Sequence, residues 1–187
     1  METFEVRGLR YEVRDFLKYK IQSQNINTTK KNMKINIGLT EKALKHNSTQ
    51  LSILLADEYL LYTKTRNYHW NVTGANFQEL HKFFEEQYTI LDAQIDEIAE
   101  RVRMLGNTPA ASLKDFLKLT RLKEASVQGA QEMLQSLLKD HEHIIKDLRT
   151  DIKATSDNED VGTSDFLTAL MEAHEKMAWM LRAYIEI

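Results

Sequence analysis

Two histidines and three carboxylates in one stretch of the sequence are of types that bind metal ions. His69 and His81 flank the segment NVTGAN, and Glu85, Asp96 and Glu100 follow at helical intervals. Imidazole nitrogen and carboxylate oxygen together suit transition metals. Since the chain has no cysteine, thiolate sites, cysteine nucleophiles and disulfides are excluded. The question is whether the fold can bring these five side chains to one ion.

The elements that must position them are helices. One proline and six glycines in 187 residues leave long stretches free to be helical. Apolar residues recur at helical spacing, which predicts long helices over residues 40–67, 76–105, 126–154 and 166–185. Residues 110–120, AASLKDFLKLT, predict a short helix in the connection between the second and third of these. We therefore expect an all-α fold, a four-helix bundle whose long connection crosses over.

The candidate ligands of the second helix lie on the same face of the helix but at different positions along its axis. At about 100° per residue, Glu85, Asp96 and Glu100 all lie within roughly 100° of His81. At about 1.5 Å per residue, however, His81 and Asp96 are roughly 22 Å apart along the axis. One chain thus holds two half-sites. If two copies of this helix packed antiparallel across a two-fold axis near Ile90, each half-site would meet the other.

A site inside one bundle is the alternative. Carboxylate-bridged di-iron bundles use Glu-x-x-His pairs from two helices, and no Glu in this chain is followed by His three residues later. The sequence therefore favours a site between subunits. Taken singly, His69 could be a packing residue, and Asp96 and Glu100 could form surface pairs with Arg101 or Arg103.

The segments YHWNVTGANFQELHKFFEEQYTILDAQIDEIAERVRMLG and HEKMAWMLRAYI resemble the Dps family of ferritin-like proteins, which protect DNA in stressed bacteria. The resemblance covers residues 37–187. It implies a hollow dodecamer that oxidises Fe(II), preferably with hydrogen peroxide, and stores Fe(III). It also implies that His69, His81 and Glu85 come from one subunit and Asp96 and Glu100 from its neighbour. Many members have Asp where this chain has Glu85.

Residues 1–36 lie outside the resemblance and form a basic, flexible extension by our prediction. They carry eight basic and four acidic residues, a formal charge of +4. Because the whole chain has a net charge of −3, the remaining residues carry −7. Such an arm could reach DNA, and a DNA-compacting role with iron oxidation secondary is the alternative function. The alternative for the arm is a solvated extension, and Met33 is an alternative start. Without a long apolar run, we expect a cytoplasmic protein, associated with the nucleoid if it binds DNA.

Three further expectations concern single residues. The resemblance places the acidic segment before the fourth helix near a three-fold axis, where Asp157, Glu159, Asp160 and Asp165 could line a pore for Fe(II). The alternative is a solvated loop in which Thr163 or Ser164 caps the helix. Trp70 is expected in the core, and His46, His141, His143 and His174 in surface or packing roles.

Overall fold

The computed structural model describes residues 3–6, 9–12, 35–126 and 129–185. The chain divides into a short N-terminal unit, Met1–Ile35, and a helical unit, Asn36–Ile187. The first unit contains two antiparallel strands, β1 (Thr3–Val6) and β2 (Leu9–Glu12), which the sequence did not predict. Their register pairs Phe4 with Tyr11 and Val6 with Leu9. Met33 and most of the basic residues of the segment 1–36 lie outside the described ranges.

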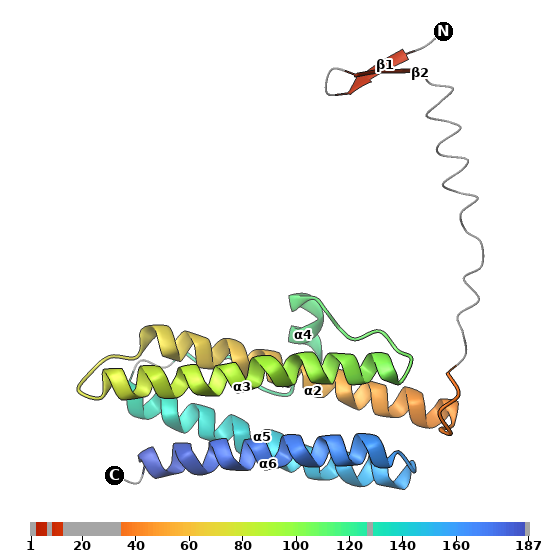
Figure 1. The fold of residues 1–187 in the computed structure, drawn as a ribbon. Helices are drawn as coiled ribbons and strands as arrows, with labels where there is room; N and C mark the ends of the chain where they lie inside the picture. The colour runs from red at the N-terminus through yellow and green to blue at the C-terminus, as the bar shows by residue number, and fades with distance from the viewer. Residues whose placement is uncertain (1–2, 7–8, 13–34, 127–128, 186–187) are drawn as a thin grey trace. The chain divides into compact units, whose positions relative to one another are not determined.

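The described residues of the helical unit form four long helices and one short one (Figure 1). They are α2 (Glu41–Asn71), α3 (Phe77–Met104), α4 (Leu113–Leu119), α5 (Ala130–Asp157) and α6 (Val161–Ile185). Helices α2 and α3 form one antiparallel pair, and α5 and α6 form the other. The predicted all-α four-helix bundle with a short helix in its long connection is confirmed.

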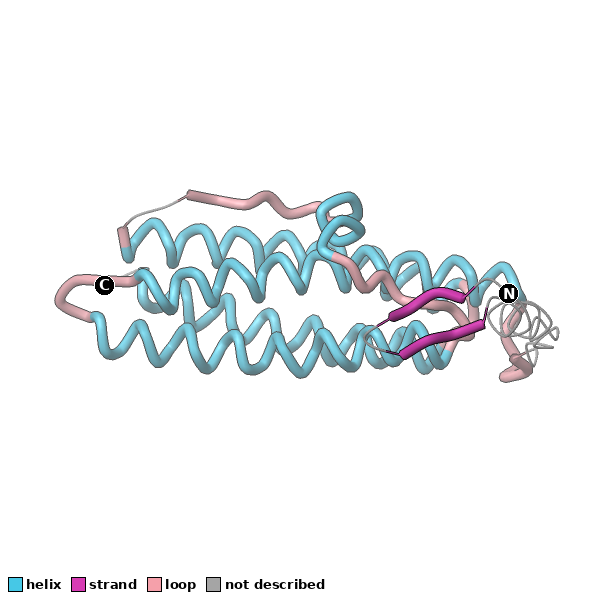
Figure 2. The backbone as a smooth tube through the Cα atoms, turned by 90° about the horizontal axis from the view of Figure 1, so that it is seen from above, coloured by secondary structure: helices cyan, strands magenta, loops and turns pink. Residues whose placement is uncertain are grey.

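The connection between α3 and α5 crosses from one end of the bundle to the other, with α4 lying midway against α2 (Figure 2). It is anchored by Arg121, whose guanidinium contacts the carboxylates of Asp57 at 2.7 Å and Asp147 at 3.0 Å. The buried Asp57 also accepts hydrogen bonds from the Thr120 hydroxyl and the Arg121 backbone N–H. This crossover lets α3 and α5 run in the same direction.

Local sequence signals set the helix ends. The Thr40 hydroxyl accepts a hydrogen bond from the Ala43 N–H and caps α2. After α3, Gly106 adopts a φ of +83°. Its N–H donates to the Arg103 carbonyl while that of Asn107 donates to the Val102 carbonyl. This pair of bonds is a Schellman motif, and it ends the helix.

The core lies along the bundle axis. On α3 the buried residues follow one stripe: Leu80, Phe83, Phe84, Gln87, Leu91, Gln94, Ile98 and Val102. Tyr68 of α2 is 1% exposed and packs beside Phe84. Trp70, by contrast, is 64% exposed, so its expected place in the core is wrong. It lies two residues beyond the buried Tyr68, and a displacement of about 200° turns it to the opposite side of the helix. No helix within the described ranges is both long and apolar enough to cross a membrane.

Candidate metal centre

His69 and His81 lie face to face where α2 ends and α3 begins. Their rings stack with centroids 3.7 Å apart and planes 20° from parallel. The Nδ1 atom of His69 is 2.7 Å from the carbonyl oxygen of His81, and Nδ1 of His81 is 2.8 Å from that of His69. The two histidines therefore hold the ends of both helices together across the turn.

This exchange fixes the tautomer of each ring. A carbonyl oxygen can only accept, so each Nδ1 must carry the proton that it donates. In the neutral ring, Nε2 then keeps its lone pair, which is the form that binds a metal ion. A hydrogen bond from the other ring nitrogen to a backbone carbonyl is a common support for metal-binding histidines. Both histidines are thus held in the tautomer that a metal ion would require of them.

Glu85 lies one turn after His81 on α3 and is exposed. Its carboxylate accepts a hydrogen bond of 3.4 Å from the hydroxyl of Tyr88. The ring of Tyr88 meets that of His69 edge-on, with centroids 5.2 Å apart. Burial, reinforced by the negative charge of Glu85, raises the pKa of Tyr88, so its hydroxyl remains a donor at neutral pH. We call His69, His81 and Glu85 the imidazole half-site.

Asp96 and Glu100 form the carboxylate half-site, one turn apart near the other end of α3. Both are exposed and face away from their own bundle. Neither pairs with the neighbouring arginines: Arg101 binds Asp160 and Thr163, and Arg103 binds the carbonyl of Asn107. Ile90, between the half-sites, is 44% exposed. The ligand-bearing face of α3 is therefore an outer surface of the single chain.

A single chain does not bring the five candidate ligands together. Across the described part of the chain, no three His, Asp or Glu side chains are grouped so that they could hold one metal ion. The structure unites His69 with His81, leaves Glu85 one turn away, and keeps Asp96 and Glu100 separate at the far end of α3. To hold a metal ion, either half-site would need further ligands from outside this chain.

An arginine and three aromatic rings adjoin the imidazole half-site. The guanidinium carbon of Arg66 lies 4.8 Å from the ring centre of Tyr88, 5.2 Å from that of Trp70 and 5.5 Å from that of Tyr62. It also donates a hydrogen bond of 2.6 Å to the Tyr62 hydroxyl. This cluster was not predicted from the sequence, although Arg66 is four residues from both Tyr62 and Trp70, a spacing that places all three on one helical face.

A second polar cluster lies inside the bundle, on three different helices. The Nε2 atom of His174 is 2.7 Å from the carboxylate of Glu58, and its Nδ1 is 2.9 Å from Nδ1 of His141. All three side chains are fully buried. Burial, followed by the proximity of His174, holds the pKa of His141 well below its ordinary value, so that ring stays neutral. The packing role expected for His141 and His174 is thus a hydrogen-bonded chain joining α2, α5 and α6.

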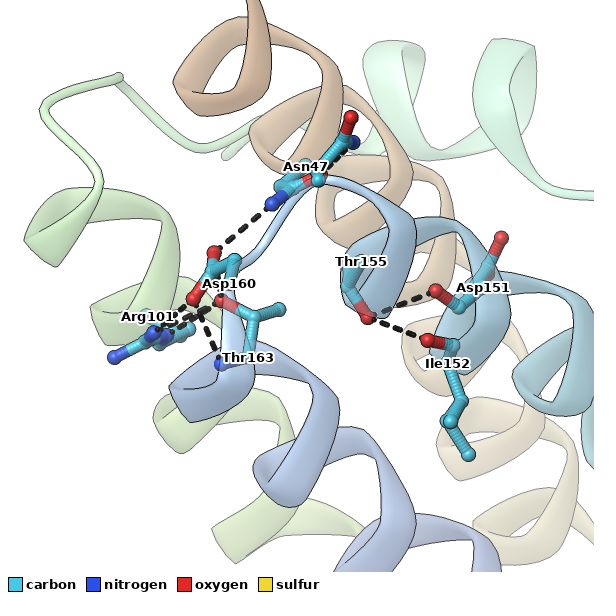
Figure 3. Close-up of polar contacts among 8 residues, drawn as sticks. Asn47, Arg101, Asp151, Ile152, Thr155, Asp160 and Thr163 are labelled. Carbon is cyan, nitrogen blue, oxygen red and sulfur yellow. Dashed lines mark hydrogen bonds and ion pairs between the residues drawn. The ribbon is translucent and has the colours of Figure 1, made fainter. Parts of the chain in front are cut away.

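The acidic segment before α6 is built around Asp160, which is only 3% exposed (Figure 3). Its carboxylate accepts hydrogen bonds from the backbone N–H and hydroxyl of Thr163, from Asn47 and from Arg101. Asp160 therefore caps α6, a role that the alternative to the pore assigned to Thr163 or Ser164. Because these donors surround it, the carboxylate of Asp160 is not exposed to line the pore expected at a three-fold axis. Asp157, Glu159 and Asp165 are exposed.

Comparison with known proteins agrees with this fold. The family model for the ferritin-like domain matches residues 48–187. The crystal structure of a Dps protein from Vibrio cholerae O1, described as a member of a superfamily of ferritin-like diiron-carboxylate proteins, superposes with a TM-score of 0.78 at 33% identity. It covers 82% of this chain and 98% of that one. The chain is therefore a ferritin-like protein.

Sequence relatives narrow the family further. DNA protection during starvation protein 2 from Bacillus anthracis is 39% identical over 70% of this chain and 90% of its own length. An uncharacterized low temperature-induced protein from Nostoc sp. is 48% identical over 82% of this chain and 87% of its own. A Dps structure from Bacillus brevis, 34% identical, superposes with a TM-score of 0.76 over 79% of this chain and 99% of that one. The chain belongs to the Dps family.

Proposed function

We propose that this protein oxidises Fe(II) at centres shared between two copies of the chain and stores the Fe(III) in a hollow dodecamer. Iron is thus the substrate. One observation carries the proposal: the candidate ligands form two separate half-sites, and in each of them the carboxylates are exposed on the outer face of α3. His81 is half-buried beside them, and His69 is 8% exposed. An antiparallel two-fold contact through α3 would bring the imidazole half-site of each copy level with the carboxylate half-site of the other. Both centres would be completed by one contact.

The ligand types support iron oxidation with hydrogen peroxide as the preferred oxidant. Two Fe(II) ions held together supply the two electrons that reduce one peroxide, with two protons, to two water molecules. A single Fe(II) supplies one electron and would release hydroxyl radical. Carboxylates favour Fe(III), the harder product, and the absence of thiolates leaves no ligand sulfur to be oxidised. Removing Fe(II) and peroxide together would protect DNA in the cytoplasm.

Complementation between two inactive variants tests the shared centre. His81→Ala and Asp96→Ala should each abolish peroxide-driven Fe(II) oxidation in homo-oligomers. In mixed oligomers, each contact between unlike chains has one centre with both defects and one with neither. Equal co-expression should therefore restore about a quarter of wild-type activity if subunits assort randomly. Stopped-flow absorbance of the ferric product measures it, and repeating it with oxygen tests the oxidant preference. Mixed oligomers no more active than the two parents would exclude the shared centre.

DNA compaction is a second candidate function, favoured by the charge of residues 1–36. Their formal +4 contrasts with −7 on the remainder, and the body alone should not bind a polyanion. Relatives named DNA protection during starvation proteins occur in Bacillus anthracis and Brevibacillus brevis. Electrophoretic mobility shifts at several salt concentrations, for the full chain and for the chain from Met33 onward, test this role. Equal DNA binding by both forms would show that the extension plays no part in DNA binding.

A further inference from the structure

Glu85 and Glu100 have the most flexible side chains among the candidate ligands, and Glu85 is the one that belongs to the imidazole half-site. A Glu side chain has one more rotatable bond than Asp, and this one is exposed on α3. A ligand that must be immobilised on binding loses conformational entropy, which weakens the site unless something orients it beforehand. Within the described ranges, the hydrogen-bond donor to its carboxylate is Tyr88, three residues later on the same helix.

Tyr88 is itself held in place from several sides. Its ring packs edge-on against His69, with centroids 5.2 Å apart at 81°, and against Tyr62, with centroids 6.2 Å apart at 88°. The guanidinium of Arg66 lies over its face at 4.8 Å. Edge-to-face contacts and a cation over a ring both have preferred geometries, so these neighbours fix the direction in which the Tyr88 hydroxyl points.

Arg66 is held equally firmly. Its Nη1 donates to the Tyr62 hydroxyl at 2.6 Å, and its guanidinium also lies over the ring of Trp70. Tyr62, Arg66 and Trp70 follow one another at four-residue intervals on α2. The C-terminal turns of that helix thus present a rigid support to Tyr88, which lies on α3.

We propose that Tyr88 is a positioning residue for Glu85, and that Arg66 fixes Tyr88 for this task. The inference rests on the proposed function, because it assumes that Glu85 binds iron. The hydroxyl occupies one acceptor position on Oε1 and leaves the other carboxylate lone pairs for the ion. An outer partner of this kind orients a ligand without touching the metal. It compensates for the extra methylene of Glu85.

Metal binding to the assembled full-length protein provides the test. Co(II), which gives a visible spectrum and is not oxidised by peroxide as readily as Fe(II), is titrated while absorbance and heat are recorded. Tyr88→Phe removes the hydroxyl and keeps the ring. We expect it to weaken Co(II) binding about tenfold, at the lower end of the effect of losing an outer partner. Arg66→Met should weaken binding in the same direction, because the ring loses its support.

Tyr59→Phe is the matched control. Tyr59 stacks on Phe116, with centroids 4.5 Å apart, at a distance along α2 from the imidazole half-site. Removing its hydroxyl should leave Co(II) affinity unchanged. Oligomer size and thermal stability should be the same for Tyr59→Phe, Tyr88→Phe and wild type, which separates positioning of Glu85 from general damage to the fold.

Glu85→Asp gives the decisive comparison. The shorter carboxylate cannot reach the Tyr88 hydroxyl, so adding Tyr88→Phe to Glu85→Asp should have no further effect on Co(II) affinity or spectrum. Equal effects of Tyr88→Phe in the wild-type and Glu85→Asp backgrounds, or none in either, would overturn the inference. His81→Ala distinguishes the two levels of failure. If it leaves Co(II) binding intact, the proposed centre fails and this inference with it; if it abolishes binding, only the role of Tyr88 is in question.

Discussion

Replacing Asp160 should destabilise the protein more than any other change in the acidic segment. Asp160→Ala removes the cap of α6, for which about 1 kcal/mol is typical. It also leaves the Asn47 amide without its acceptor and Arg101 without its carboxylate partner, although Arg101 keeps its hydrogen bonds to the Thr163 hydroxyl. Removing one partner of a fully buried ion pair costs about 3 to 5 kcal/mol, but Arg101 is 22% exposed and can recover part of this through water. We expect a total loss of about 3 kcal/mol, since these contributions overlap.

Two further variants separate the contributions. Asp160→Asn keeps an acceptor for the helix cap but loses the charge facing Arg101, so about 1 to 2 kcal/mol should be lost. Asp157→Ala is the control, because Asp157 is an exposed carboxylate three residues away whose partner, Lys153, is also exposed. It should change stability by less than about 0.5 kcal/mol. Denaturant unfolding at one subunit concentration measures all three, since assembly contributes to the apparent stability.

The effect should also depend on pH with a definite sign. Burial alone would raise the pKa of Asp160, but hydrogen bonds from Thr163 and Asn47, together with Arg101, hold it below its ordinary value. A carboxyl with a lowered pKa stabilises the fold above its unfolded pKa of about 3.9, and this contribution disappears as the pH falls through the folded pKa. The difference between wild type and Asp160→Ala should therefore be full at pH 6 and shrink below pH 4. A loss no larger than that of Asp157→Ala, or one independent of pH down to pH 2, would refute the reasoning.

Two other predictions concern buried and backbone features. His141 stays neutral in the fold while its unfolded form takes up a proton below its ordinary pKa of about 6.5, so thermal stability should fall as the pH drops from 7.5 to 5.5. His141→Gln should flatten that dependence, and an unchanged slope would contradict the assignment. Gly106→Ala should destabilise by about 1 to 2 kcal/mol because φ is +83°, whereas Glu159→Gly, at a φ of 60°, should not destabilise and should gain up to about 1 kcal/mol. Denaturant unfolding of Gly106→Ala and Glu159→Gly measures these two changes in stability.

The helices were predictable because their signals are local. Apolar spacing located all four long helices, and Gly106 marked the end of α3. The start of α6 was wrong by five residues, Phe166 against Val161. Its cap is Asp160, which depends on Arg101 and Asn47 from distant parts of the chain as well as on the adjacent Thr163. No local sequence pattern predicts the contacts of Asp160 with Arg101 and Asn47.

The imidazole half-site was partly predictable for the same reason. His69 and His81 flank one turn, so their approach follows from the helical hairpin itself. The chain of Glu58, His141 and His174 has no comparable signal, because its members lie on three helices and meet only when the two helical pairs pack. The exchange of hydrogen bonds between the backbone and rings of His69 and His81 also depends on the precise approach of two helix ends. Residue types and spacing cannot specify that approach.

The separation of the two half-sites along α3 has a consequence for when the chemistry can start. A newly synthesised chain carries ready histidines, but its carboxylate half-site lies at the opposite end of the same helix. In the proposed arrangement such a chain cannot oxidise iron, however much Fe(II) and peroxide surround it. Oxidation would begin only once two chains had met in the correct orientation. Its onset would therefore nearly coincide with assembly of the shell that receives the insoluble product. Assembly would then determine when the reaction starts, and unassembled subunits would be inactive because neither half-site is complete.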